Sequence, residues 1–106
     1  MLDICLIGVY NRCMIKTFAD KETEGIYNQK FSRQLPVDIQ RTALKKMIML
    51  NAAHSINDLR VPPYNHLESL KGDRAGQHSI RINKAWRICF VERDGDFYDV
   101  EIVDYH

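Results

Sequence analysis

The chain has 106 residues, which is enough for one domain with a modest hydrophobic core. Hydrophobic residues account for 45% of the chain and charged residues for 27%, which excludes an intrinsically disordered protein. The formal net charge of +1 favours no class of partner, so a nucleic-acid interface would require locally segregated cations.

The first thirteen residues are apolar but too few to cross a membrane. They carry Asp3 and have no basic residue ahead of the apolar run, which is unlike a secretory signal peptide. They form either an additional edge strand or an extension upstream of the domain, and we favour the extension. A regular pattern begins at Met14, so we predict a domain over residues 14–106 that opens with a half-buried strand over 14–18.

Two helices are expected next. Asp20 offers an N-cap for a helix over 21–30, and Pro36 suits the first turn of a second helix within 35–53. The second helix has an apolar stripe at helical spacing, formed by Ile39, Ala43, Met47 and Leu50 and widened by Leu44. Its cations are expected on or near the other side: Arg41, Lys45 and Lys46. We interpret the methionine-rich stripe as core packing rather than as a partner groove.

A long connection over residues 51–76 separates the helices from the strands. It contains the proline-stiffened "RVPPYNH", and loops of this length in compact domains are often functional. Alternating patterns then predict strands over 79–83, 86–91 and 96–103. Helices followed by strands indicate an α+β fold, with two N-terminal helices packed on one face of a small antiparallel sheet.

The register of the last two strands follows from burial of one face. A two-residue turn at Asp94–Gly95 would place Asp99 opposite Phe90 and mix charge into the core face. A turn one residue longer pairs Phe90 with Val100, Ile88 with Ile102 and Arg87 with Val103. We therefore predict the longer turn, with Arg87 on the open face of the sheet.

Charge is segregated along the last third of the chain. From Lys71 to Arg93 there are six cations and two acids, a local charge of +4, and from residue 94 onward there are five acids and no Lys or Arg. A basic sheet face would suit RNA phosphates, whereas cross-strand ion pairs on a solvated face would explain the same pattern. The candidate RNA-binding cations in this segment are Arg74, Arg81 and Lys84.

No motif points to a metal or a cofactor. Three cysteines without a CxxC spacing and four scattered histidines match neither a disulfide framework nor a zinc site, and they indicate a reducing compartment such as the cytoplasm. Ser-His-Asp, Walker and GxGxxG signatures are also missing. What remains is a loop lysine, a strand arginine and a terminal Tyr–His pair, which suffice for phosphodiester transfer within RNA.

These residues occur in stretches that match a known family. The run from His66 to His106, with "LKGDR", "SIRIN", "WRI" and the closing "DYH", closely resembles the HigB branch of the RelE-like toxins. "MIKTFADKETEGIYN" is similar to the start of that family, so the resemblance covers residues 14–106. It implies the RelE-like fold and the toxin half of a bacterial toxin–antitoxin module.

The resemblance also implies an activity and partners. Members are ribosome-dependent endoribonucleases that cleave mRNA in the A site without a metal, bind a HigA-type antitoxin, and reach operator DNA only through that complex. It implies that Lys71 and Arg87 stabilise the phosphorane, that His106 acts as general base or acid, and that Tyr105 orients the nucleotide. The alternatives are a toxin of the same fold that binds a protein such as gyrase, and an inactive module that only binds the antitoxin.

One position departs from the family pattern. Some relatives have a histidine three residues before the loop lysine, where this chain has Glu68; His66 lies two residues further upstream. A carboxylate beside an RNA phosphate would be repulsive, so we expect Glu68 to point elsewhere, toward an arginine. Because the α-carboxylate of His106 should raise the pKa of its imidazole, a C-terminal tag is expected to lower activity.

Overall fold

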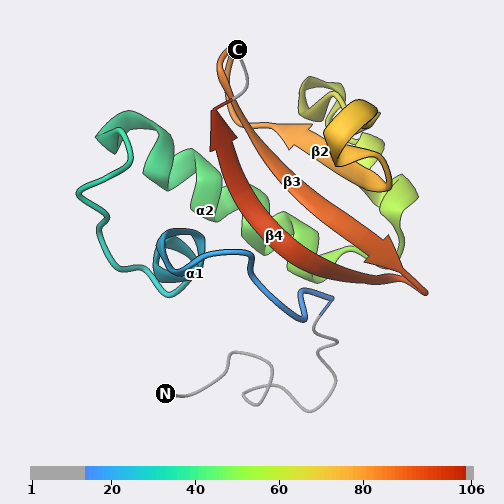
Figure 1. Ribbon diagram of the computed structural model, residues 1–106, viewed down its shortest axis with the longest axis horizontal. Helices are drawn as coiled ribbons and strands as arrows, with labels where there is room; N and C mark the ends of the chain where they lie inside the picture. Colours follow the sequence, from blue (N-terminus) through green and yellow to red (C-terminus); the bar gives the residue numbers. More distant parts are fainter. Residues whose placement is uncertain (1–13, 105–106) are drawn as a thin grey trace.

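The computed structural model describes residues 14–104, which form two helices, three 3-10 turns and four strands (Figure 1). In chain order these are α1 (Lys21–Tyr27), α2 (Val37–Ala52), η2 (Ile56–Arg60), η3 (Pro63–Asn65), β1 (Glu68–Ser69), η4 (Gly72–Arg74), β2 (Gln77–Arg81), β3 (Trp86–Arg93) and β4 (Asp96–Asp104). Within these residues, no helix is long and apolar enough to cross a membrane.

Helix α1 begins where the sequence predicts. The side chain of Asp20 accepts a hydrogen bond from the Thr23 amide at 2.7 Å, which satisfies one free N–H of the first turn. The helix ends at Tyr27, three residues before the predicted end. Gln29 has a φ of 65°, a left-handed backbone conformation that cannot continue the helix.

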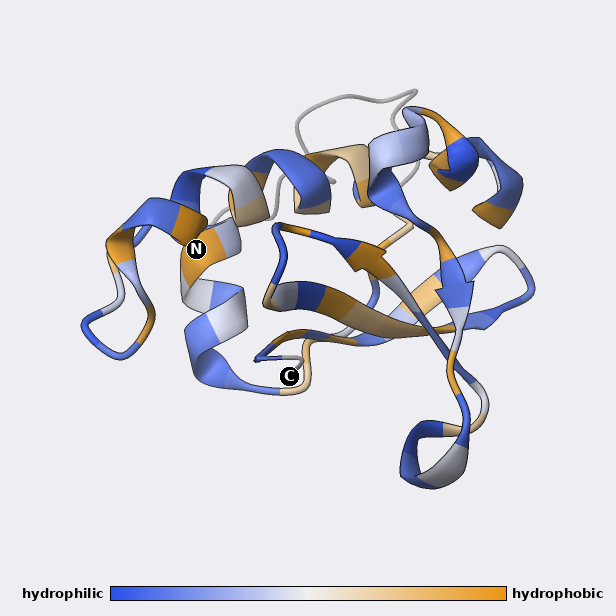
Figure 2. Ribbon diagram, turned by 90° about the horizontal axis from the view of Figure 1, so that it is seen from above, coloured by the Kyte–Doolittle hydropathy of each residue, from blue (hydrophilic) through white to orange (hydrophobic). Residues whose placement is uncertain are grey.

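Helix α2 buries the predicted stripe, because Ile39, Ala43, Met47 and Leu50 are all in the core. Figure 2 shows hydrophobic residues recurring between hydrophilic ones around the helix. The prediction that Lys46 lies on or near the exposed side is wrong. Lys46 is buried, and its Nζ donates a hydrogen bond to Oδ1 of Asn65, because the η2–η3 segment packs against this side of α2. Burial lowers the pKa of Lys46, and the neighbouring Lys45 adds to this effect.

The connection over residues 51–76 is more structured than predicted. Leu59 and Asn65 are completely buried, and the Asn65 side-chain amide donates to the Leu59 carbonyl at 3.0 Å. Further along, β1 pairs with β2, with Glu68 opposite Ser79. This strand was not predicted from the sequence, because two residues are too few to show an alternating pattern.

The strands form an antiparallel sheet in the order β1-β2-β3-β4. The three strands predicted from the sequence correspond to β2, β3 and β4. The predicted strand over 14–18 instead runs parallel to β4 and joins it at two isolated bridges, Ile15 with Phe97 and Phe18 with Val100. It therefore extends the sheet beside β4 without forming a full strand.

The predicted pairing of β3 with β4 is confirmed where Ile88 lies opposite Ile102 and Arg87 opposite Val103, but the predicted longer turn is wrong. Arg93 pairs with Asp96, so the turn is two residues, Asp94 and Gly95, and both have positive φ. The extra residue that the predicted core pairing requires lies within β4 and not in the turn. The register shifts between Cys89 and Val91, where Phe90 faces two residues of β4.

This β-bulge reconciles the short turn with a continuous core. Asp99 has a φ of 54°, and the extra residue changes which face the following side chains occupy. Phe97 and Val100, three positions apart, are both fully buried as a result. The ring of Phe97 packs edge-on against Phe90 with centroids 4.9 Å apart.

The buried core joins the helices to one set of strand residues. The core cluster contains Met47 and Leu50 from α2 together with Ile80, Ile88 and Ile102 from the strands. In Figure 1, α2 runs behind the sheet. The intervening strand residues, including Ser79 and Arg87, point to the opposite face, which we call the site face.

Candidate active site

Arg87 lies on the site face, as predicted from the alternation of β3. It pairs with Arg81 of β2 on one side and Val103 of β4 on the other. The face is not open at this position, however, because Arg87 is only 7% exposed. The segment that leads from η3 into β1 covers it, which the sequence could not show.

Among the described residues, three contact the guanidinium of Arg87: Ser79, His66 and Glu68. Its Nε donates to Oγ of Ser79 at 2.7 Å, and one terminal nitrogen donates to the carbonyl of His66 at 2.5 Å. His66 follows η3 with a φ of 45°, a left-handed conformation that costs free energy in a residue other than glycine. The strained backbone directs a carbonyl at the arginine, and the guanidinium is thereby fixed in one orientation.

The third group is Glu68, whose carboxylate lies 3.3 Å from the same terminal nitrogen of Arg87. Glu68 points toward an arginine, as predicted, but this arginine is the predicted phosphate contact itself, whereas the sequence led us to expect the carboxylate away from the phosphate. Its side chain is 53% exposed, whereas that of Arg87 is 8% exposed, so the pair presents its carboxylate to solvent. An anion that binds Arg87 must therefore displace Glu68 or share the arginine with it. His66, in turn, contacts Arg87 through its backbone carbonyl.

A second arginine–carboxylate pair lies on the same face. Arg74, at the end of η4, donates to Gln77 at 2.9 Å and forms an ion pair with Glu101 of β4 at 3.3 Å. This ion pair joins a 3-10 turn to β4, so it supports the alternative of ion pairing that the sequence offered for Arg74, although it does not link two strands. In this pair, a cation of the basic segment lies beside an acid of the acidic segment that follows it in the sequence.

Two small side chains lie between these pairs. Ser79 of β2 is directly opposite Cys89 of β3, and both are fully buried. Burial raises the pKa of the Cys89 thiol, so this cysteine stays protonated near neutral pH. Cys89 therefore serves as part of the floor of the site face and is a poor nucleophile.

The other predicted cations are dispersed along the face. Arg81 lies with its guanidinium carbon 5.5 Å from the centroid of the Tyr64 ring, and its Nε is buried without a hydrogen-bond partner among the described residues. Lys84 is exposed between β2 and β3, and Lys71 is exposed directly before η4. Neither lysine has a described contact that identifies a ligand.

The pairing separates Lys71 from Arg87. The Leu70 amide donates to the Gln77 carbonyl at one end of β2, whereas Arg87 pairs with Arg81 at the other end. The two ends are about 13 Å apart at 3.3 Å per residue. The Arg87 side chain shortens this gap because it reaches back to Ser79.

The closing Tyr–His pair lies outside the described residues. The described part of β4 ends at Asp104, which is opposite Trp86, the neighbour of Arg87. The predicted pairing of Val103 with Arg87 is therefore confirmed, and the roles of Tyr105 and His106 stay predictions.

Sequence reasoning missed Ser79 and Tyr64 as partners of the arginines. The alternating pattern of β2 could have identified Ser79, because it places Ser79 on the same face as Arg81, two residues later. Tyr64 lies in a 3-10 turn and had no comparable signal. No group of three or more His, Cys, Asp or Glu within residues 14–104 could hold a metal ion.

The arrangement suits recognition of a phosphate. A guanidinium offers several N–H donors in a planar fork that matches phosphate oxygens. Arg87 uses some of these donors to stay in place, while its half-exposed partner Glu68 is accessible to exchange with another anion. What the site face can do chemically is orient a phosphodiester and balance charge that develops on it.

Comparisons with known proteins identify the family of this chain. The family described as RelE-like toxin of type II toxin–antitoxin system HigB matches residues 16–106. Toxin HigB-1 of Vibrio cholerae is 40% identical over 83 residues, which cover 77% of this chain and 87% of that protein. Endoribonuclease HigB of Proteus vulgaris is 31% identical over 93 residues, which cover 88% of this chain and all of that protein.

Proposed function

Because the chain belongs to the HigB-type, RelE-like toxins of type II toxin–antitoxin systems, we propose that it is a ribosome-dependent endoribonuclease that cleaves mRNA in the A site and inhibits translation. The observation that carries the proposal is the fixed guanidinium of Arg87. It is buried, held by Ser79 and the His66 carbonyl, and paired with the half-exposed carboxylate of Glu68. The relative from Proteus vulgaris, named an endoribonuclease, supports the reaction type.

The proposed reaction is transfer within the RNA, without a metal. The 2′-oxygen attacks phosphorus, its proton passes to a base, the bond from phosphorus to the 5′-oxygen breaks, and that oxygen takes up a proton. The products are a 2′,3′-cyclic phosphate and a 5′-hydroxyl. The ribosome supplies much of the orientation by holding the codon in place.

Each proposed residue has one role. Arg87 and Lys71 stabilise the charge of the phosphorane, His106 acts as general base or acid, and Tyr105 orients the nucleotide. Histidine suits either proton transfer because it titrates near neutral pH. Arg81 and Lys84 contact the RNA backbone more weakly.

Arg74 has a smaller share in RNA binding in this proposal. Its ion pair with Glu101 and its hydrogen bond to Gln77 already use part of its donors. We expect it to contribute to the shape of the site face more than to the binding of phosphate.

We propose the same partners that the family implies: a HigA-type antitoxin, the ribosome with its mRNA, and operator DNA through the toxin–antitoxin complex. A cytoplasmic location follows from a ribosomal substrate. We also infer that α1 and α2 cover one face of the sheet and leave the other to the RNA, because the core cluster joins Ile26 and Met47 to the strands. The domain is proposed to comprise residues 14–106.

The test is cleavage of a reporter mRNA on purified ribosomes, read by primer extension. Arg87→Ala and His106→Ala should lower cleavage by at least about a hundredfold, since removal of one transition-state contact costs that much. Arg93→Ala, exposed at the far end of the same strand, is the matched control and should cleave normally.

A second variant distinguishes loss of the guanidinium group from loss of the fold. Arg87→Lys keeps the charge but loses the planar fork, and we expect it to fold and to cleave poorly. Undiminished cleavage by Arg87→Ala and His106→Ala would refute the proposal. Growth arrest by a chain that leaves mRNA intact and inhibits gyrase would establish the alternative of a protein target.

A further inference from the structure

Within residues 14–104, the exposed apolar side chains gather on or beside the outer side of α2. Every large hydrophobic side chain that is exposed among the described residues lies on α2 or on a segment beside it, with exposed fractions from 48% to 71%: Phe31, Val37, Ile48, Val61 and Tyr64. Single exposed apolar residues are ordinary, but a cluster on one face indicates an interaction surface.

One apolar cleft lies between α2 and the segment around η3. It has a volume of about 390 Å³, and its walls include Ile48 and Met49 of α2 and Pro62 and Tyr64 opposite them. The Tyr64 ring lies 5.5 Å from both Lys46 Nζ and the Arg81 guanidinium carbon. Both distances are within the range of a cation–π contact, so two cations favour this position of the ring at the wall of the cleft.

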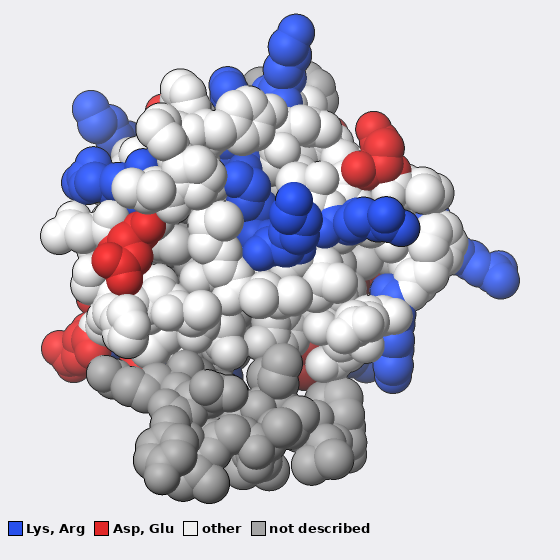
Figure 3. Space-filling view, turned by 180° about the vertical axis from the view of Figure 1, so that it is seen from behind, with Lys and Arg blue, Asp and Glu red and all other residues white. Residues whose placement is uncertain are grey.

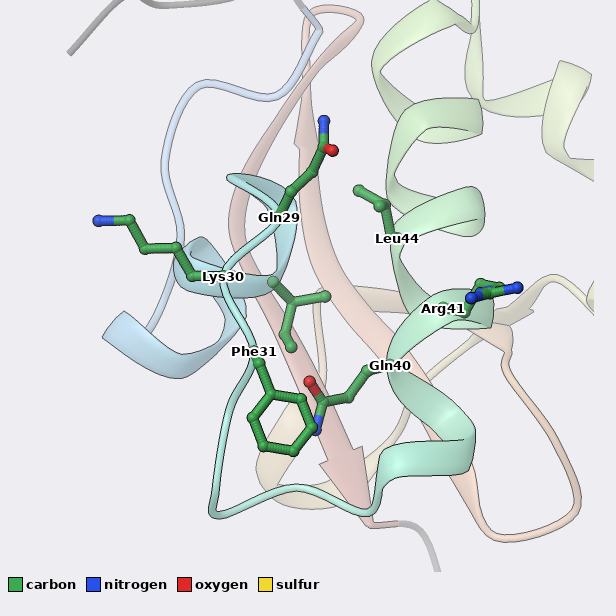
Figure 4. A pocket seen from close by; sticks show the side chains of 7 residues that line it. Gln29, Lys30, Phe31, Gln40, Arg41 and Leu44 are labelled. Atoms are coloured by element: carbon green, nitrogen blue, oxygen red, sulfur yellow. The ribbon is translucent and has the colours of Figure 1, made fainter.

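A second cleft lies on the other flank of α2, toward α1. It has a volume of about 230 Å³. Figure 4 shows the Phe31 ring beside Gln40 at one end and Leu44 near Gln29 at the other. Gln40 is fixed, because its side-chain amide donates to the carbonyls of Ser32 and Leu35 at 2.8 and 2.9 Å. The loop that carries Phe31 is thereby tied to α2.

Cations surround both clefts, and no acidic residue lines either of them. The cations that line them are Lys30, Arg41, Lys45 and Lys46. By helical spacing, Arg41, Lys45 and Ile48 form one exposed ridge between the clefts. Figure 3 shows Lys and Arg side chains in a band across the middle of the face that α2 occupies. The site face, with Arg87, lies on the other side of the sheet, and Tyr64, which lines one cleft, also contacts Arg81 of the site face.

We propose that the outer face of α2 is the docking surface for an acidic amphipathic segment of the antitoxin. Its apolar side chains fill the two clefts, and its carboxylates meet the Arg41–Lys45 ridge. The partner is the antitoxin that membership of the toxin family implies; the proposal does not depend on RNA cleavage. A protein segment fits better than RNA, because the walls are aliphatic and aromatic as well as basic.

The test measures the affinity of the full-length chain for the antitoxin encoded beside it, by titration calorimetry. The double variant Phe31→Ser/Ile48→Ser should bind at least about tenfold more weakly, because central apolar contacts dominate such interfaces. Both side chains are exposed, so these substitutions leave the core intact.

A charge-reversal pair provides a matched control. Lys45→Glu should weaken antitoxin binding several-fold and more strongly at low salt, whereas Lys16→Glu, exposed beside β4, should leave it unchanged. Every variant is also assayed for mRNA cleavage on ribosomes, which should stay normal because none of these residues belongs to the proposed catalytic set.

The results separate the two proposals. Unchanged antitoxin affinity in both the double variant and Lys45→Glu would overturn the docking surface, whatever the cleavage assay shows. If Lys45→Glu instead lowers binding to ribosomes while antitoxin affinity is unchanged, the face binds ribosomal RNA and the docking proposal is wrong. Loss of antitoxin binding in a chain that never cleaves mRNA would support docking and refute the nuclease.

Discussion

The site face and the outer face of α2 use their cations differently. On the site face, Arg87 and Arg74 each have a carboxylate partner at 3.3 Å, Glu68 and Glu101 respectively. The clefts around α2 are lined by cations and by no acid. Paired arginines keep a defined geometry and suit one anion at one place, whereas unbalanced cations around apolar clefts suit a broad acidic surface.

Burial explains why pairing matters on the site face. An exposed ion pair contributes little to stability, but a buried arginine without partners would be costly. Arg87 is one of few buried charged side chains, and Ser79, His66 and Glu68 together balance that cost. The exposed Lys45 and Arg41 need no such support, which leaves them available to a partner.

The largest effect should come from the core that both faces share. Met47→Ala removes a fully buried side chain between α2 and the sheet, and it should cost about 2–5 kcal/mol of unfolding free energy. Antitoxin binding and mRNA cleavage should then fall together. Ile48→Ala, the exposed neighbour, is the control and should change stability by less than about 0.5 kcal/mol in urea denaturation. Equal stability of the two variants would contradict this packing.

The next effect should separate the faces. Ser79→Ala leaves Nε of the buried Arg87 without its acceptor, which should cost about 1–3 kcal/mol and lower mRNA cleavage about tenfold or more. Antitoxin affinity should not change. Ser69→Ala, exposed on the neighbouring strand β1, is the control for both assays. Normal cleavage by Ser79→Ala would show that the orientation of Arg87 is set by other contacts.

A smaller effect should test the displaceable carboxylate. Glu68→Gln removes the charge that competes with phosphate for Arg87 but keeps an acceptor for its N–H. We expect mRNA cleavage at limiting ribosome concentration to rise several-fold and to become more sensitive to salt. Glu101→Gln, in the second pair, should have less effect. A large loss of cleavage in Glu68→Gln would instead identify Glu68 as a group that takes part in proton transfer.

The smallest effect concerns the floor of the site face. Burial raises the pKa of the Cys89 thiol above its ordinary value of 9.0, so the unfolded chain ionises first as the pH rises. The stability that this group contributes is present below pH 9.0 and is lost as the pH rises through the folded pKa. The free energy of unfolding should fall between pH 8 and 10 more steeply in the native chain than in Cys89→Ala. Identical pH profiles would contradict the burial.

Much of the fold could be predicted because the spacing of apolar residues along the chain shows which side of each helix or strand is buried. The stripe from Ile39 to Leu50 indicated which side of α2 is buried, and alternation in β3 placed Ile88 and Arg87 on opposite faces. That Glu68 would point toward an arginine was also predicted, because a carboxylate beside an RNA phosphate would be repulsive, but its pairing with Arg87 itself was not predicted.

Other features were beyond the sequence because they depend on contacts between distant segments. The bulge opposite Phe90 arises because a two-residue turn and a continuous core require registers that differ by one residue. The position of the extra residue along β4 depends on how the sheet packs against the core, which the sequence pattern does not show. Lys46 is buried because a segment about twenty residues later packs over it and supplies Asn65.

The sequence by itself determined the order of the two helices and the three long strands, the buried stripe of α2, the pairing of Ile88 with Ile102 and the family that its motifs resemble. Only the tertiary structure decided that Arg87 is covered and held by Ser79 and His66, and that clefts flank α2. The physical reason is the separation along the chain between the residues that determine each feature. Periodicity reports which side of an element is buried, whereas covering and clefts depend on which remote segment lies against that side.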